Sequence, residues 1–204
     1  MAESAGLGER QTIMERAEET GRKWRTALHE AGHAVMAIVE RRPFQDIVIG
    51  DTPTERGMVR GLLLSPLDDD QVRIHLGGIM SARLSLPRWH RRLFQGAHDD
   101  LGEVARFYRH RSDVAATLAR NVSATASSLV ANWSAVHALA LRLERRGRAT
   151  FDEALQAART QASGLRPQGT LGARGWRPLV EHVLWRVRYP GGLRDALAAH
   201  GVEL

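Results

Sequence analysis

The strongest constraint on the fold is the apolar periodicity of residues 22–40. Apolar side chains recur there at steps of three and four, at Trp24, Leu28, Ala31, Val35 and Ile38. This spacing is typical of one face of an α-helix. Pro43 follows and predicts the end of that helix. The sequence therefore predicts a helix with one buried face, and the polar residues inside it need a separate explanation.

Two histidines and a glutamate lie inside this predicted helix, in the segment His29-Glu30-Ala31-Gly32-His33. Residues four apart project from one helix face about one turn apart, so both imidazoles can bind one zinc ion at ~2.0–2.1 Å. Glu30 is placed to accept a proton from water at such a site. Gly32 costs a helix ~1 kcal/mol relative to alanine, which close packing at that point would explain.

A catalytic zinc site needs a third protein ligand and an open fourth position. The chain contains no cysteine, so the ligand must be His, Asp or Glu. Met36 stands where an extended histidine motif would have a glycine, and the third ligand therefore comes from elsewhere. Spacing alone does not decide which carboxylate is the third ligand. The candidates are Glu55, Asp68, Asp69, Asp70, Asp99 and Asp100.

The segment after the predicted helix contains two short β-rich runs. Residues 47–49 and 57–64 are separated by turn residues and predict a hairpin with a long loop. The three aspartates 68–70 can cap a helix that runs to about residue 86. A further helix is expected from the turn at residues 96–100 to about residue 110.

The second half of the chain reads as helical. Residues 113–146 predict one long helix, ended by Gly147, and the pair Thr150 and Glu153 predicts the start of another helix, to about residue 161. A glycine-rich break at residues 164–175 precedes a Trp/Arg helix at 178–188, a turn at 190–192 and a last short helix.

Composition indicates a globular chain. Hydrophobic residues make up 43% and charged residues 25%, and no apolar run reaches the ~18–20 residues that cross a bilayer. The start of the chain is polar and mixed in charge, unlike a signal peptide. We therefore expect a cytoplasmic protein with no membrane partner.

The net charge of +6 raises the question of nucleic-acid binding. Lys23 is the only lysine, and the arginines are scattered rather than interleaved with aromatic residues, so this partner is disfavoured. A nucleic-acid face would best be formed by Trp176, Trp185, Arg186 and Arg188. Because Leu179, Val183 and Val187 share the same helical stripe, we interpret that segment as packing against the core.

Four segments resemble the peptidase domain of the FtsH-type AAA proteases. Residues 28–35, Leu-His-Glu-Ala-Gly-His-Ala-Val, carry the resemblance most strongly. Residues 76–78, Leu-Gly-Gly, resemble the start of that family's Gly-Gly-Arg-Ala-Ala-Glu helix. Residues 96–101, Gly-Ala-His-Asp-Asp-Leu, resemble its Gly-Ala-x-Asn-Asp-Leu turn, and residues 138–153 are similar to its last long helix. The resemblance covers residues 20–160.

The resemblance implies that His29, His33 and Asp100 bind one Zn²⁺ ion per chain and that Glu30 is the general base. Asp99 stands where the family has asparagine. Both Asp99 and His98 are candidates for contacts that orient the metal ligands without binding the ion themselves. Residues 79–83 lack the glutamate that the family carries on its Gly-Gly helix. The remaining histidines, His75 among them, are interpreted as surface or core residues.

The expected fold is α+β and predominantly helical, with a zincin-like helix, a small β-hairpin or sheet and a long C-terminal helical bundle. We divide the chain into a polar N-terminal leader at 1–20, a zinc peptidase-like domain at 21–163 and a C-terminal extension at 164–204, with a linker and short helices.

The function implied by the resemblance is that of a zinc metalloendopeptidase, whose polypeptide substrate lies extended beside the edge of the hairpin at 44–64. There is no Gly-x-x-x-x-Gly-Lys-Ser/Thr loop. We therefore expect ATP-independent action on peptides and on unfolded or flexible polypeptides, unless a partner ATPase supplies unfolding. The sequence does not decide whether the chain forms a homo-oligomer. The missing glutamate motivates the alternative, a weak or inactive peptidase-like module that binds or regulates.

Overall fold

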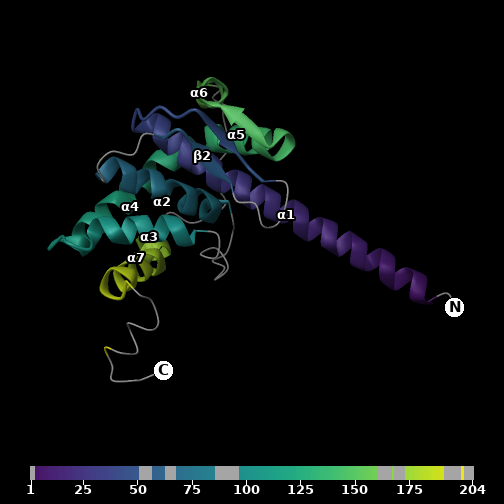
Figure 1. Ribbon diagram of the computed structural model, residues 1–204, viewed down its shortest axis with the longest axis horizontal. Coiled ribbons are helices and arrows are strands. Elements are labelled where there is room, and N and C mark those ends of the chain that lie inside the picture. Colours follow the sequence, from purple (N-terminus) through teal and green to yellow (C-terminus); the bar gives the residue numbers. More distant parts are fainter. Residues whose placement is uncertain are drawn as a thin grey trace.

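The computed structural model describes residues 3–50, 57–62, 68–85, 97–159, 167, 173–190 and 199, without the side chains of 3–20 and 173–175. Within these ranges the chain is predominantly helical with a small antiparallel sheet (Figure 1), which confirms the predicted α+β class. Most of the predicted break at 164–175, of the predicted turn at 190–192 and of the last short helix lies outside the described residues.

The first helix, α1 (Glu3–Val39), is long and continuous. The predicted polar segment at 1–20 and the predicted amphipathic helix at 22–40 are therefore parts of one element, of which residues 3–39 are helical. Its N-terminal half extends away from the other elements (Figure 1). Its C-terminal half is inside the core, where Leu28, Ala31 and Val35 are buried as the periodicity predicts.

A close crossing of α1 with α2 (Asp69–Leu84) forms the centre of the molecule. A Cβ atom on Gly32 would lie 2.2 Å from Ser81 Oγ and 2.3 Å from the Gly77 carbonyl oxygen. The Ser81 hydroxyl is shared between the carbonyl oxygens of Leu28 and Gly78, at 2.7 and 2.9 Å. Glycine at position 32 therefore allows the two helices to approach, which explains its place inside a helix.

The predicted start of α2 is confirmed in detail. Asp68 is the N-cap, and its side chain accepts a hydrogen bond of 2.9 Å from the backbone N–H of Gln71. This is the normal way to satisfy a free N–H group at a helix start.

The predicted hairpin is also present, and it belongs to a larger sheet. Strand β1 (Asp46–Val48) pairs antiparallel with β2 (Met58–Arg60) on one side and with β3 (Arg148–Thr150) on the other. The order β2-β1-β3 makes β2 an edge strand. The third strand was not predicted, because its three residues stand between a helix-ending glycine and a helix-starting Thr–Glu pair.

One sequence prediction about the helices is wrong. Residues 113–146 do not form one helix: α4 (Val114–Ala131) and α5 (Trp133–Arg146) meet at Asn132. The Asn132 side chain donates a hydrogen bond of 2.9 Å to the Ser128 carbonyl. Side-chain bonding of this kind competes with the helical backbone pattern, and it allows the chain to turn.

The ends of α5 and of the next helix agree with the prediction. Gly147 has φ +69°, a left-handed conformation that glycine adopts without strain. Thr150 and Glu153 form the expected reciprocal hydrogen bonds at the start of α6 (Phe151–Arg159).

The remaining helices pack on the same core. α3 (His98–Tyr108) lies between α2 and α7 (Ala173–Arg188). Trp176, Leu179 and Val183 of α7 are buried, which confirms the packing interpretation of this segment. α7 begins five residues before Pro178, the predicted start. In the described part of the chain, no helix combines the length and the apolar character that crossing a bilayer requires.

Candidate functional site

Three side chains from two helices converge on one point. His29 and His33 come from α1, and Asp100 comes from the first turn of α3. The His29 Nε2 atom lies 2.9 Å from Asp100 Oδ2 and 3.0 Å from His33 Nε2, and His33 Nε2 lies 3.3 Å from the same carboxylate oxygen. The structure therefore brings together the two motif histidines and one of the six open carboxylates.

The triangle of these three atoms matches the donor set of a small divalent cation. In a tetrahedral zinc site with bonds of ~2.0–2.1 Å, ligand atoms are separated by about 3.3 Å. Gly78 of α2 borders the triangle, and a Cβ atom there would lie 2.2 Å from His33 Nε2. Glycine therefore keeps space next to the ligand atoms. The three residues could hold one metal ion.

Hydrogen bonds orient both a histidine and the carboxylate. The Nδ1 atom of His33 donates to the carbonyl oxygen of Ile74 at 2.8 Å, which leaves the Nε2 lone pair for a cation. The adjacent residue, His75, contacts Asp100: its Nδ1 atom lies 2.9 Å from Asp100 Oδ1. Neighbouring residues of α2 thus contact two of the three converging side chains.

The electrostatics of the cluster favour positive charge. Burial is the largest single influence and lowers the pKa of His33, but Asp100, the Glu30 carboxylate and the Ile74 carbonyl together raise it to about 9. Burial raises the pKa of Asp100, whereas His33, His29 and His75 together hold it well below its usual range. The carboxylate therefore stabilises a cation between the two imidazoles, either a proton or a metal ion.

Glu30 lies beside the cluster on α1 and is 5% exposed. Burial raises the pKa of its carboxyl group, and the nearby His33 and His29 oppose that shift. Within the described ranges no group donates a hydrogen bond to the Glu30 carboxylate. A Cβ atom on Gly57, the residue before β2, would lie 2.4 Å from Glu30 Oε1. The start of the edge strand therefore lies directly against the buried Glu30 carboxylate.

Among the described residues, the other predicted site residues lie outside the ligand group of His29, His33 and Asp100. His98 and Asp99 are 71% and 76% exposed in their side chains, and their nearest charged atoms are 3.8 Å apart. Glu55 lies outside the described residues.

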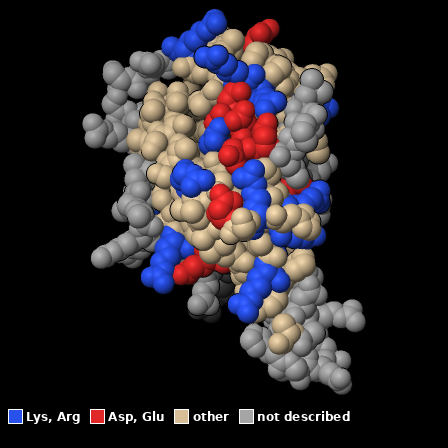
Figure 2. All heavy atoms as spheres, turned by 90° about the vertical axis from the view of Figure 1, so that its left-hand side faces the viewer, with Lys and Arg blue, Asp and Glu red and all other residues tan. Residues whose placement is uncertain are grey.

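The three aspartates at the start of α2 bind arginines instead. Figure 2 shows acidic side chains gathered on the end of the molecule where α2 begins, with Lys and Arg side chains next to them. The ion pairs are Asp68 with Arg42, Asp69 with Arg111, and Asp70 with Arg42 and Arg73. These carboxylates are therefore not available as the third ligand.

His75 is the functional candidate that sequence reasoning missed. It was interpreted as a surface or core residue, because no motif or spacing connects it with Asp100. The contact arises from the packing of α3 on α2, which no local pattern indicates.

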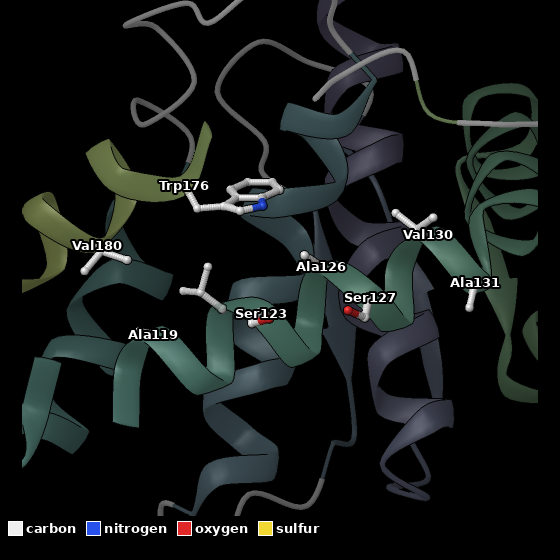
Figure 3. Close-up of a pocket in the computed structure, with 9 residues that line it drawn as sticks. Ala119, Ser123, Ala126, Ser127, Val130, Ala131, Trp176 and Val180 are labelled. Carbon is white, nitrogen blue, oxygen red and sulfur yellow. The ribbon is translucent and has the colours of Figure 1, made fainter. Parts of the chain in front are cut away.

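A pocket of about 510 Å³ lies elsewhere, between α4 and α7. Figure 3 shows the Trp176 indole extending from α7 over α4. The pocket is lined by Ala119, Val122, Ser123, Ala126, Ser127, Val130, Ala131, Trp176 and Val180. Because none of these side chains titrates near neutral pH, the pocket has no acid, base or metal ligand for hydrolysis.

Comparison with known proteins adds no family assignment: no protein-family model matches the chain, and neither does any curated protein. The chemical interpretation therefore depends on the site itself.

Proposed function

We propose that this chain is a zinc-dependent peptidase, and that His29, His33 and Asp100 hold one Zn²⁺ ion. The observation that carries the proposal is the convergence of three ligand atoms within 3.3 Å of one another, beside a buried glutamate. The resemblance to the FtsH-type peptidase domain supports the same assignment, because its motif residues are the ones that meet.

Zinc would supply Lewis acidity, which polarises the carbonyl group of a substrate amide and makes water a stronger acid. Glu30 would act as the general base and then as the general acid. Its pKa is raised by burial, so its carboxylate is a better base than an exposed glutamate. It accepts a proton from the attacking water and then delivers that proton to the departing amine. Both proton transfers therefore use one side chain, Glu30.

The edge strand β2 offers a place for the substrate backbone. An extended peptide can add to an exposed strand through main-chain hydrogen bonds. Gly57 precedes β2 and touches Glu30, so a peptide aligned along this edge passes the proposed base. These contacts involve the backbone, and we infer limited sequence preference. Peptides and unfolded or flexible segments fit this arrangement, because these 204 residues contain no P-loop to drive unfolding.

The test compares the wild-type chain with Glu30→Gln, both loaded with zinc. We expect both to retain one zinc per chain by elemental analysis, and the variant to lose cleavage of casein or a fluorogenic peptide by about 10²- to 10⁴-fold. Glu181→Gln is the matched control, because Glu181 is exposed on α7; it should cleave like the wild type.

Two outcomes would contradict the proposal. Wild-type activity in Glu30→Gln would exclude Glu30 as the base. Zinc bound by both proteins without cleavage of any unfolded substrate by either would favour the peptidase-like binding module.

A further inference from the structure

The two oxygens of the Asp100 carboxylate have different partners. Oδ2 faces the motif histidines, at 2.9 Å from His29 Nε2 and 3.3 Å from His33 Nε2. Oδ1 faces the Nδ1 atom of His75, at 2.9 Å. One oxygen is therefore directed to the proposed ion, and the other is directed away from it.

The chemistry of the pair fixes the direction of the His75 hydrogen bond. Asp100 would bind a cation as an ionised carboxylate, which only accepts hydrogen bonds, so the hydrogen atom in the 2.9 Å contact is on His75 Nδ1. Within the described residues, the other ring nitrogen, Nε2, is buried and has no hydrogen-bond partner. In the part of the chain that the structure describes, the contact with Asp100 is thus the polar contact that this partly buried ring makes.

We propose that His75 is a positioning residue that fixes Asp100 as a ligand through one oxygen only. This inference rests on the proposed zinc site. A carboxylate can bind a metal ion with one or both oxygens. By occupying Oδ1, His75 restricts Asp100 to Oδ2 and leaves the fourth position of the ion open, as a hydrolytic site requires.

The position of His75 next to Ile74 explains how α2 can align ligands from two other helices. The Ile74 carbonyl accepts the hydrogen bond from His33 of α1, and the next side chain holds Asp100 of α3. α2 is itself held against α1 by the close approach at Gly32. One turn of α2 therefore sets the distance between the motif helix and the distant carboxylate.

The test uses two substitutions of nearly equal size. In His75→Asn the side-chain amide nitrogen occupies the place of Nδ1 and can donate to Asp100. In His75→Leu the shape is similar to that of asparagine and the donor is absent. His110→Leu, at an exposed position beyond the C-terminus of α3, is the control for loss of a histidine.

Zinc affinity is measured by competition with a chelator, and the geometry is measured from the visible absorption of the Co²⁺-substituted protein. We expect His75→Leu to bind zinc about 10- to 100-fold more weakly. Its Co²⁺ absorption should also weaken, because a freed Oδ1 lets the carboxylate bind through both oxygens and raises the coordination number. His75→Asn and His110→Leu should resemble the wild type in both measurements.

The outcomes separate this inference from the proposed function. If the wild type binds no zinc, the proposed function fails. If the wild type binds zinc, Asp100→Ala loses it, and His75→Leu matches the wild type in affinity and Co²⁺ spectrum, the positioning role alone is refuted. Equal loss in His75→Asn and His75→Leu would also refute it, because the hydrogen-bond donor would then not matter.

Discussion

Asp46 and Asp100 are both shielded from solvent, and they are neutralised in different ways. The side chain of Asp46, in β1, is 1% exposed and pairs with Arg60 of β2 and Arg148 of β3, at 2.5 and 2.6 Å. Asp100, in α3, is 16% exposed and faces three imidazoles. The first carboxylate binds permanent cations, and the second binds side chains that can be neutral.

This difference separates a structural ion pair from a candidate metal site. Arginine stays protonated at every physiological pH, so the charge of Asp46 is balanced whenever the sheet is formed. Imidazoles balance Asp100 only when they carry a proton or share a metal ion with it. The Asp46 cluster is thus complete within the chain, whereas the Asp100 cluster could hold an exchangeable cation.

The largest expected effect is on metal binding. Asp100→Ala removes one of three ligands and should weaken zinc binding by more than about 100-fold, beyond the cost of losing an outer hydrogen bond. Asp99→Ala, at the exposed neighbouring position, should bind zinc like the wild type, and so should Asp46→Asn. Chelator competition measures all three. Zinc loss in Asp99→Ala with retention in Asp100→Ala would mean that the wrong neighbour has been assigned.

The next effect is on stability and tests the close crossing of α1 and α2, which positions the histidines of the Asp100 cluster and does not involve the Asp46 cluster. Gly32→Ala places a methyl group 2.3 Å from the Gly77 carbonyl oxygen. We expect it to destabilise the fold by about 3 kcal/mol and to weaken zinc binding, because α1 carries two ligands. Gly21→Ala on the same helix meets no atom within 4 Å and should stabilise by up to about 1 kcal/mol. Urea unfolding measures both, and equal stability of the two variants would contradict the described crossing.

Asp46→Asn tests the sheet cluster alone. The substitution removes the charge that accepts hydrogen bonds from Arg60 and pairs with Arg148. Because both guanidinium groups remain partly hydrated, we expect a loss of about 2 kcal/mol in the free energy of unfolding. Zinc affinity should be unchanged, since β1 contributes no ligand. A decrease in zinc affinity as large as that of Asp100→Ala would remove the distinction between the clusters.

The smallest effect is a pH dependence. The hydrogen bond from Arg60 is the main reason that the pKa of Asp46 is lowered, and the charge of Arg148 adds to it. A carboxyl group whose pKa is lower in the folded state adds stability above its unfolded pKa of ~3.9, and that stability is lost as pH falls through the folded pKa. The stability difference between the wild type and Asp46→Asn should therefore shrink below about pH 4. A difference that grows on acidification would have the wrong sign.

The local elements were predictable where one short pattern determines them. The two motif histidines share a helix face, Asp68 caps α2, and Gly147 ends α5, as their spacing indicates. The break at Asn132 was not predicted, because the alanine-, valine- and leucine-rich pattern continues on both sides of it. A polar side chain that bonds back to its own helix has no periodic signal.

The candidate site was predictable only in part, for a related reason. Spacing identified the histidines, but it left six carboxylates open, and only the resemblance favoured Asp100. His75 had no signal at all, since its contact with Asp100 depends on how α2 packs against α3. Contacts between helices distant in the sequence require the tertiary structure.

The most direct test of the central claim is a diffraction experiment on crystals grown with zinc, with data collected on both sides of the zinc absorption edge. The account predicts one anomalous peak per chain, ~2.0–2.1 Å from His29 Nε2, His33 Nε2 and Asp100 Oδ2. A zinc ion bound by other residues, or no peak between these three side chains at saturating zinc, would contradict it.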